Sequence, residues 1–202
     1  MQERAIKTKS KILTVAINEF SEKGYYGARI DDIAEKAQVN KQRIYAYYGN
    51  KEKLFTEVLK HSYDTVINAE SFIKDFSEDD IPYLGEIILK EYIKFHESHP
   101  EFWRLLMWEN LSEVKHLSAL ADLRSESMSA IALLYEKGQA LGCFKKEVQF
   151  TSFIYTLTAL SYFMFSNRYS MSTMFSVDYN DESNREHLVN DILKILSLPT
   201  RP

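Results

Sequence analysis

The chain has 202 residues, a formal net charge of −4 and 45% hydrophobic residues, enough for a substantial core in one large domain or in a small and a larger one. Its single cysteine, Cys143, excludes an internal disulfide and favours a reducing, cytoplasmic setting. The N-terminus has no apolar signal core, and no run reaches the roughly 18–20 apolar residues of a membrane span. With only 6 Gly and 4 Pro, the composition favours long helices over many turns.

The first predicted helix ends near residue 24. Its apolar stripe has helical spacing and consists of Ile12, Leu13, Ala16, Ile17 and Phe20. Gly24 suits the position just after a helix, where a left-handed backbone is common.

Two short helices joined by a tight turn are predicted over residues 28–48. The first has an apolar stripe made of Ile30, Ile33, Ala34 and Ala37. Val39 then fills the core, and Asn40 offers a side-chain oxygen that starts the second helix. On that helix the expected inward-facing residues are Ile44, Tyr45 and Tyr48, which leaves residues 41–43 exposed at its N-terminal end. This arrangement is typical of a helix-turn-helix that enters a DNA major groove.

The rest of the chain is also predicted to be helical, without strands or internal repeats. Asn50 is the expected cap of a helix that continues to about Ile67, and Pro82 suits the first turn of the next one. Further helices are expected at 84–99, 100–111, 117–141, 150–165 and 187–196, with a loop at 178–184. The predicted fold class is all-α.

The segment from Phe150 to Phe165 leaves almost no polar face. A helix that is apolar all round must be buried on all sides. In a body of this size, we expect one side to face the protein's own core and the other to meet a second subunit.

A family resemblance rests on the first 55 residues. It is carried by the stripe from Ile12 to Phe20 and by Gly24-Tyr25, Gly27, Asp32-Ile33-Ala34, Ala37, Val39, Ile44-Tyr45, Tyr48, Lys51-Glu52 and Leu54. In spacing and residue type this pattern closely resembles the TetR family of bacterial transcriptional regulators. Two positions depart from it, because Gln38 stands where the turn usually has Gly, and Ala28-Arg29 replaces a Ser or Thr cap. Gln38 is therefore expected to adopt a left-handed conformation at a cost of about 1 kcal/mol.

The resemblance implies a three-helix DNA-binding domain at 1–55 joined to a larger helical ligand-binding and dimerisation domain at 56–202. It also implies that the last two long helices, about 147–168 and 185–197, pair with those of a second copy as a four-helix bundle. Two-fold symmetry then places two reading helices about 34–36 Å apart, matching successive major grooves of a palindromic double-stranded operator.

Geometry assigns roles within the reading head. The predicted base contacts are Lys41, Gln42 and Arg43, since Arg can fork onto guanine and Gln onto adenine. The predicted phosphate contacts are Tyr45, Tyr47 and Lys51, and Arg29 is placed to reach the DNA backbone. Asp31, near the start of the first short helix, favours the helix dipole but would repel phosphate. The alternative for each cation is an ordinary solvated position, and for Tyr45 a place in the core.

Charge is divided unevenly along the chain. Residues 1–55 carry 11 Lys/Arg and 7 Asp/Glu, whereas residues 56–202 carry 14 and 22. A basic head on an acidic body suits DNA binding, because phosphate neutralisation needs only local positive charge.

The body is rich in aromatic residues that could line an effector cavity. The predicted lining consists of Phe102, Trp103, Met107, Trp108, Tyr135, Tyr155, Tyr162 and Phe163. These suit a small, largely apolar ligand. The alternative is that aromatic residues at helical spacing belong to the core.

No catalytic pattern is complete, and we expect no enzyme activity, metal or cofactor. In His96-Glu97-Ser98-His99 the second histidine is one residue too near for a zinc-protease helix. Glu113 and His116 match half of a di-iron motif, whose second half is missing.

The sequence therefore predicts a homodimeric, ligand-responsive regulator, most simply a repressor released by its effector. Two alternatives remain open. One is a DNA-organising or division-associated protein that needs no inducer, and the other is a small-molecule carrier or enzyme with a vestigial helix-turn-helix.

Overall fold

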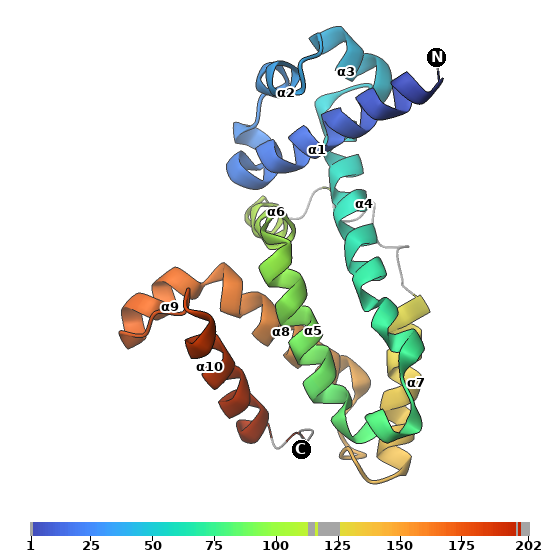
Figure 1. The fold of residues 1–202 in the computed structure, drawn as a ribbon, viewed down its shortest axis with the longest axis vertical. Helices are drawn as coiled ribbons and strands as arrows, with labels where there is room; N and C mark the ends of the chain where they lie inside the picture. Colours follow the sequence, from blue (N-terminus) through green and yellow to red (C-terminus); the bar gives the residue numbers. More distant parts are fainter. Residues whose placement is uncertain (1, 113–115, 117–125, 197, 199–202) are drawn as a thin grey trace. The chain divides into compact units, whose positions relative to one another are not determined.

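The structure is a computed structural model that describes residues 2–112, 116, 126–196 and 198, and in this part of the chain every regular element is a helix (Figure 1). The α-helices are α1 (Gln2–Gly27), α2 (Ile30–Ala37), α3 (Lys41–Tyr48), α4 (Lys51–Ala69), α5 (Leu84–Ser98), α6 (Pro100–Leu111), α7 (Glu126–Ala140), α8 (Phe150–Ser166), α9 (Arg168–Phe175) and α10 (Glu182–Ile195). Two 3₁₀ helices, η1 (Glu70–Asp75) and η2 (Glu78–Tyr83), separate α4 from α5. The all-α prediction is confirmed.

Some predicted boundaries differ from the observed ones. Pro82 lies inside η2 and not in the first turn of α5, because a capping box between Ser77 and Asp80 starts this separate 3₁₀ helix. The last helix starts at Glu182, inside the predicted loop, where the Asp181 side chain accepts a hydrogen bond from the Asn184 amide. Residues 117–125 of the predicted 117–141 helix lie outside the described part of the chain.

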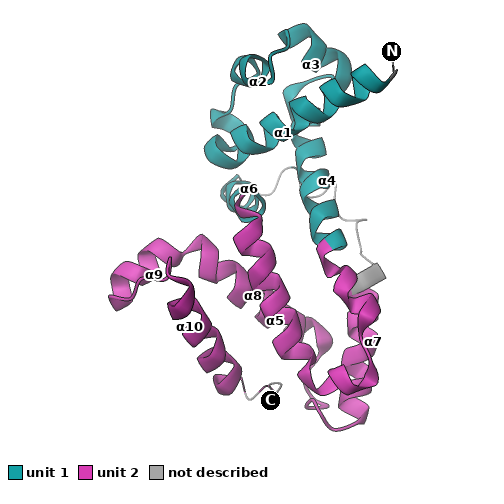
Figure 2. Cartoon of the chain, viewed as in Figure 1, with its two compact units in different colours: residues 1–68, 101–124 teal, residues 69–100, 125–202 magenta. Residues whose placement is uncertain are grey.

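The chain folds as two compact units, residues 1–68 with 101–124 and residues 69–100 with 125–202 (Figure 2). It passes from one unit to the other after residues 68, 100 and 124. Helix α6 thus packs with the N-terminal helices although more than 30 residues of chain separate it from α4. The predicted functional boundary after residue 55 is a separate matter and stays a prediction.

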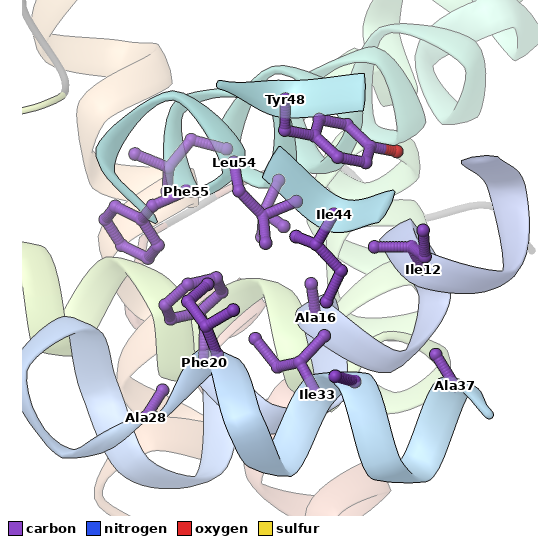
Figure 3. Close-up of a cluster of buried hydrophobic side chains, with 14 of the residues drawn as sticks. Ile12, Ala16, Phe20, Ala28, Ile33, Ala37, Ile44, Tyr48, Leu54 and Phe55 are labelled. Carbon is purple, nitrogen blue, oxygen red and sulfur yellow. The ribbon is translucent and has the colours of Figure 1, made fainter. Parts of the chain in front are cut away.

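One apolar core holds the first unit together (Figure 3). Its fully buried members come from four helices and include Ile12, Ala16, Phe20, Ile33, Ala37, Ile44, Leu54 and Phe55. The Phe20 and Phe55 rings meet edge to face with centroids 4.8 Å apart. Each such buried side chain stabilises the unit by about 1.5–3 kcal/mol. Leu105 of α6 is fully buried in the same core, so α6 is part of this unit's packing.

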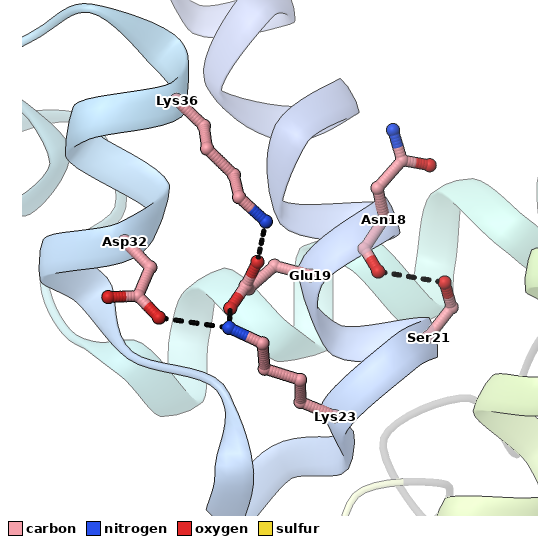
Figure 4. A network of polar contacts seen from close by, with 6 residues as sticks. All are labelled: Asn18, Glu19, Ser21, Lys23, Asp32 and Lys36. Atoms are coloured by element: carbon pink, nitrogen blue, oxygen red, sulfur yellow. Dashed lines mark hydrogen bonds and ion pairs between the residues drawn. The ribbon is translucent and has the colours of Figure 1, made fainter.

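A buried carboxylate links α1 to α2 (Figure 4). The Glu19 side chain is fully buried, receives the Lys36 ammonium at 2.5 Å and pairs with Lys23. Lys23 also donates to Asp32 at 3.0 Å. Because a buried charge without partners is costly, these cations hold the two helices in one arrangement.

The turn between α2 and α3 has the predicted strained residue. Gln38 is left-handed, with φ 56° and ψ 45°, and its backbone N–H bonds to the Glu35 carbonyl. Lys11 of α1 donates to the Gln38 side-chain oxygen at 3.0 Å. This contact helps to offset the cost of about 1 kcal/mol for a left-handed residue other than glycine.

In the second unit, α5 and α8 pack along each other, and the rings of Tyr135 and Phe153 stack with centroids 4.5 Å apart. The expectation that α8 is buried on all sides is wrong for the single chain, since Tyr155 is 75% and Phe163 48% exposed. The helix is apolar all round, but the chain covers only one of its faces. The prediction that a second subunit covers the other face is untouched by this finding.

Candidate DNA interface

The first turn of α3 presents the three predicted base-reading residues. Asn40 caps the helix, and its side-chain oxygen accepts the Arg43 amide at 2.8 Å, as predicted. Lys41, Gln42 and Arg43 are exposed. Among the described residues, the side chains of Gln42 and Arg43 make no hydrogen bond or ion pair, so both are available to a ligand.

The two tyrosines of α3 differ from their predicted orientations. Ile44 and Tyr48 are buried as expected, but Tyr45 is 40% exposed and Tyr47 is partly buried against the core. The prediction that Tyr45 points inward is therefore wrong. The helical period explains the error, because residues three and four after Ile44 share its face, whereas the next residue lies about 100° away.

Lys51 lies at the start of α4 beside a ring of α1. Its ammonium is 4.8 Å from the centre of the Tyr25 ring, a cation–π contact. Partial burial lowers the pKa of Lys51 below its usual range. Asn50 caps this helix by accepting the Lys53 amide at 2.8 Å, as predicted. Lys51 is thus held at a helix N-terminus, a favourable place for an anion.

Arg29 stands at the cap position of α2, where its extended backbone starts the helix without a capping hydrogen bond from its side chain. The Arg29 side chain is exposed. Lys41, in contrast, is engaged: its ammonium lies 2.8 Å from Asp31 Oδ1, at the start of α2. The seven predicted DNA-binding residues therefore all belong to the first unit, and their contacts with DNA stay a prediction.

Helix α6 docks on the end of α1. The Trp108 indole N–H donates to the Ser21 carbonyl at 3.2 Å, and a Cβ on Gly24 would lie 2.7 Å from the indole ring. Gly24 itself has φ 69° and ψ 176°, so the helical backbone is broken where the sequence predicts an end, although a last turn reaches Gly27. Sequence reasoning missed this docking, because periodicity identifies a buried face but not what covers it.

A buried ion pair adjoins this contact. Glu109 of α6 accepts both the backbone amide and the ring Nδ1 of His116, at 3.0 and 2.8 Å. The His116 ring packs 4.7 Å from the Tyr25 ring and 5.0 Å from the Phe55 ring. The partner of His116 is thus Glu109, whereas Glu113 of the half di-iron motif lies outside the described residues.

The eight predicted effector-lining residues divide between the two units. Phe102, Trp103, Met107 and Trp108 belong to the first, and Tyr135, Tyr155, Tyr162 and Phe163 to the second. The second unit has an apolar pocket of about 300 Å³ that includes Tyr135 but none of the other seven. Its other walls include Phe144, Phe153, Leu157 and Leu196. The assignment of the eight residues to one cavity stays a prediction.

Within the described ranges, no cluster of three or more His, Cys, Asp or Glu side chains could hold a metal ion. His96 is buried, and burial, with a smaller effect of His99, lowers its pKa to about 4. No described helix is long and apolar enough to cross a membrane.

Comparisons with known proteins agree with this geometry. The family model described as "Bacterial regulatory proteins, tetR family" matches residues 12–58, and that of the "Tetracyclin repressor-like, C-terminal domain" matches residues 87–195. The chain is 34% identical over 183 residues to the HTH-type transcriptional repressor NicS of Pseudomonas putida, with 89% of this chain and 86% of that protein covered. It is also 34% identical over 159 residues to the HTH-type transcriptional repressor SCO4008 of Streptomyces coelicolor, with 76% of each covered.

Solved structures give the same fold. The putative transcriptional regulator SCO4942 from Streptomyces coelicolor matches with a TM-score of 0.68 at 21% identity, over 93% of this chain and 97% of that one. HlyIIR, a hemolysin II transcriptional regulator, matches with a TM-score of 0.61 at 25% identity, over 85% and 94%.

Proposed function

Because the chain belongs to the TetR family of bacterial regulatory proteins, we propose that it is a repressor that binds a palindromic operator as a homodimer and is released by a small effector. The observation that carries the proposal is the first turn of α3. It offers one amide and two basic side chains, all exposed, at the N-terminal end of the second helix of a helix-turn-helix. Such side chains read base edges in the major groove.

The dimer part of the proposal is supported by uncovered apolar faces on α8 and α10. On α8 the exposed face includes Tyr155 and Phe163. On α10, Val189 and Leu193 are buried, whereas Ile195 is 80% exposed. Contiguous exposed apolar surface of this kind commonly marks a protein–protein interface. The same two helices are the pair that the family resemblance assigns to dimerisation.

The effector part is supported by the course of the chain. The first unit is joined to the second at the end of α4 and at the start of α6. Both helices also contribute to the core of the first unit, through Phe55 and Leu105. An effector that favours one conformation of the second unit would act on the head through these two connections, by as much as its affinities for the two states differ.

The effector class follows from the pocket near Tyr135. With a volume of about 300 Å³ and walls built from stacked aromatic rings, it suits a small, largely apolar molecule. Enzyme activity is not part of the proposal, and the cytoplasm is its expected setting.

The test is selection of bound sequences from a random duplex pool. Wild type is compared with a Lys41→Ala/Arg43→Ala variant and with a Lys145→Ala/Lys146→Ala variant, which removes the same charge from exposed residues of the second unit. We expect a palindrome from wild type and from the second-unit variant, and loss of information at one or more positions of each half-site from the first. Each lost base contact should cost about 1–3 kcal/mol.

Other outcomes separate the alternatives. Broad binding without a motif and without response to apolar ligands favours a DNA-organising protein. Weak binding that is indifferent to the Lys41 and Arg43 substitutions favours a carrier or enzyme with a vestigial head.

A further inference from the structure

Two oppositely charged side chains meet at the exposed N-terminal end of α3. The Lys41 ammonium lies 2.8 Å from Asp31 Oδ1 and 2.9 Å from Asp31 Oδ2. Both side chains remain accessible, with 44% of Lys41 and 70% of Asp31 exposed. A donor and an acceptor are therefore fixed side by side at the place where a helix-turn-helix faces base edges.

The neighbouring acid of α2 has a different role. Asp32 is directed to Lys23 at 3.0 Å and so belongs to the network that joins α1 to α2 (Figure 4). Asp31 makes no contact with that network. An acid in the first turn of α2 is sufficient for the helix dipole, so the dipole alone does not account for the pairing of Asp31 with Lys41.

An Asp–Lys pair has a natural complement in the major groove. Guanine presents two acceptors there, O6 and N7, and its paired cytosine presents one donor, the N4 amino group. The ammonium has three donors, so Lys41 can bind guanine and keep its contact with Asp31. The second carboxylate oxygen of Asp31 is then free to accept from cytosine.

We propose that Asp31 and Lys41 together read one G·C base pair in each operator half-site. Lys41 donates to guanine O6 and N7, and Asp31 accepts from cytosine N4. This inference rests on the proposed function, since it names a base pair of the operator. It also gives Asp31 a second effect, because a carboxylate beside phosphates weakens binding to DNA of any other sequence.

The experiment compares wild type with Asp31→Asn, Lys41→Gln and the double variant, and uses Asp32→Asn as the matched control. Each protein is put through sequence selection and is then titrated against the selected operator, against the operator with the G·C pair changed to A·T, and against a scrambled duplex. Asp31 is exposed, and a thermal unfolding curve verifies that each variant is folded.

For wild type we expect roughly 5- to 150-fold discrimination against the A·T operator, which corresponds to one good base contact. Asp31→Asn should lose most of this discrimination and bind the scrambled duplex more tightly. Lys41→Gln should lose the same discrimination but bind the scrambled duplex more weakly. The double variant should discriminate no less than either single variant, because both residues read one base pair.

Three results overturn the inference while leaving the proposed function intact. They are a G·C preference that survives in Asp31→Asn, a preference at the Lys41-dependent position for A·T, and an equal loss in Asp32→Asn. If wild type selects no motif, the proposed function fails and this inference fails with it.

Discussion

Replacing Gly24 by alanine should destabilise the first unit by about 3 kcal/mol. The backbone at Gly24 has φ 69° and ψ 176°, a region open almost only to glycine, and an alanine there costs about 1–3 kcal/mol. The new Cβ would also lie 2.7 Å from Cδ2 and 2.8 Å from Cε3 of Trp108. These atoms belong to a rigid ring, so the ring must move, and its hydrogen bond to Ser21, worth about 0.5–1.5 kcal/mol, is lost.

The assay is urea unfolding of wild type, Gly24→Ala, Trp108→Ala and the double variant. Removal of the indole removes the overlap but keeps the backbone strain, so Gly24→Ala should cost about 1–2 kcal/mol less in the Trp108→Ala background. Gly142→Ala is the control, because Gly142 also has a positive φ, 78°, but no atom within 4 Å of its Cβ position. Equal costs of Gly24→Ala in both backgrounds would refute the docking of Trp108 on Gly24.

Three further predictions concern DNA binding, assembly and acid stability. Lys51→Gln should weaken binding about equally for all sequences and reduce the salt dependence of log K by about one per contact, measured by titration over a salt series with Lys53→Gln as control. Tyr155→Ser combined with Phe163→Ser should shift sedimentation of the protein from dimer to monomer, because both side chains lie on the uncovered face of α8. Because burial lowers the pKa of His96 to about 4, the unfolded chain takes up a proton at higher pH than the folded one. Stability should therefore fall from about pH 6.5 to about pH 4, and His96→Gln should remove about 2 kcal/mol of this fall in urea unfolding at pH 7 and 4.5.

Amphipathic helices were the predictable part of the fold. The stripe from Ile12 to Phe20 and the caps at Asn40 and Asn50 depend on local chemistry, and each appears where the sequence places it. Helix α9 was not predicted, because it buries none of its residues and so has no apolar stripe directed at a core. A short helix without such a stripe gives no periodic signal.

The candidate site was predictable in position but not in contacts. Residues 41–43 were expected to be exposed and are. The partner of Lys41 depends on how α2 approaches α3, which spacing within one helix does not determine. The same limit explains Trp108, which was assigned to a cavity because its neighbours are aromatic and which instead packs on Gly24. Local patterns identify faces, whereas contacts between elements follow from the whole fold.

Trp108 also offers a way to separate coupling from binding. Effector response requires an element that both the effector and DNA influence. Helix α6 starts where the chain leaves the second unit, and it contacts the head through Leu105, Trp108 and Glu109. If α6 carries the response, Trp108→Phe should leave binding of the free protein to its operator within a few-fold of wild type. It should also reduce the change in operator affinity that an apolar effector causes, because the phenyl ring lacks the donor to Ser21. Fluorescence anisotropy of a labelled operator with and without effector measures both quantities. An unchanged effector response in Trp108→Phe, with operator release intact, would assign the coupling to α4 alone.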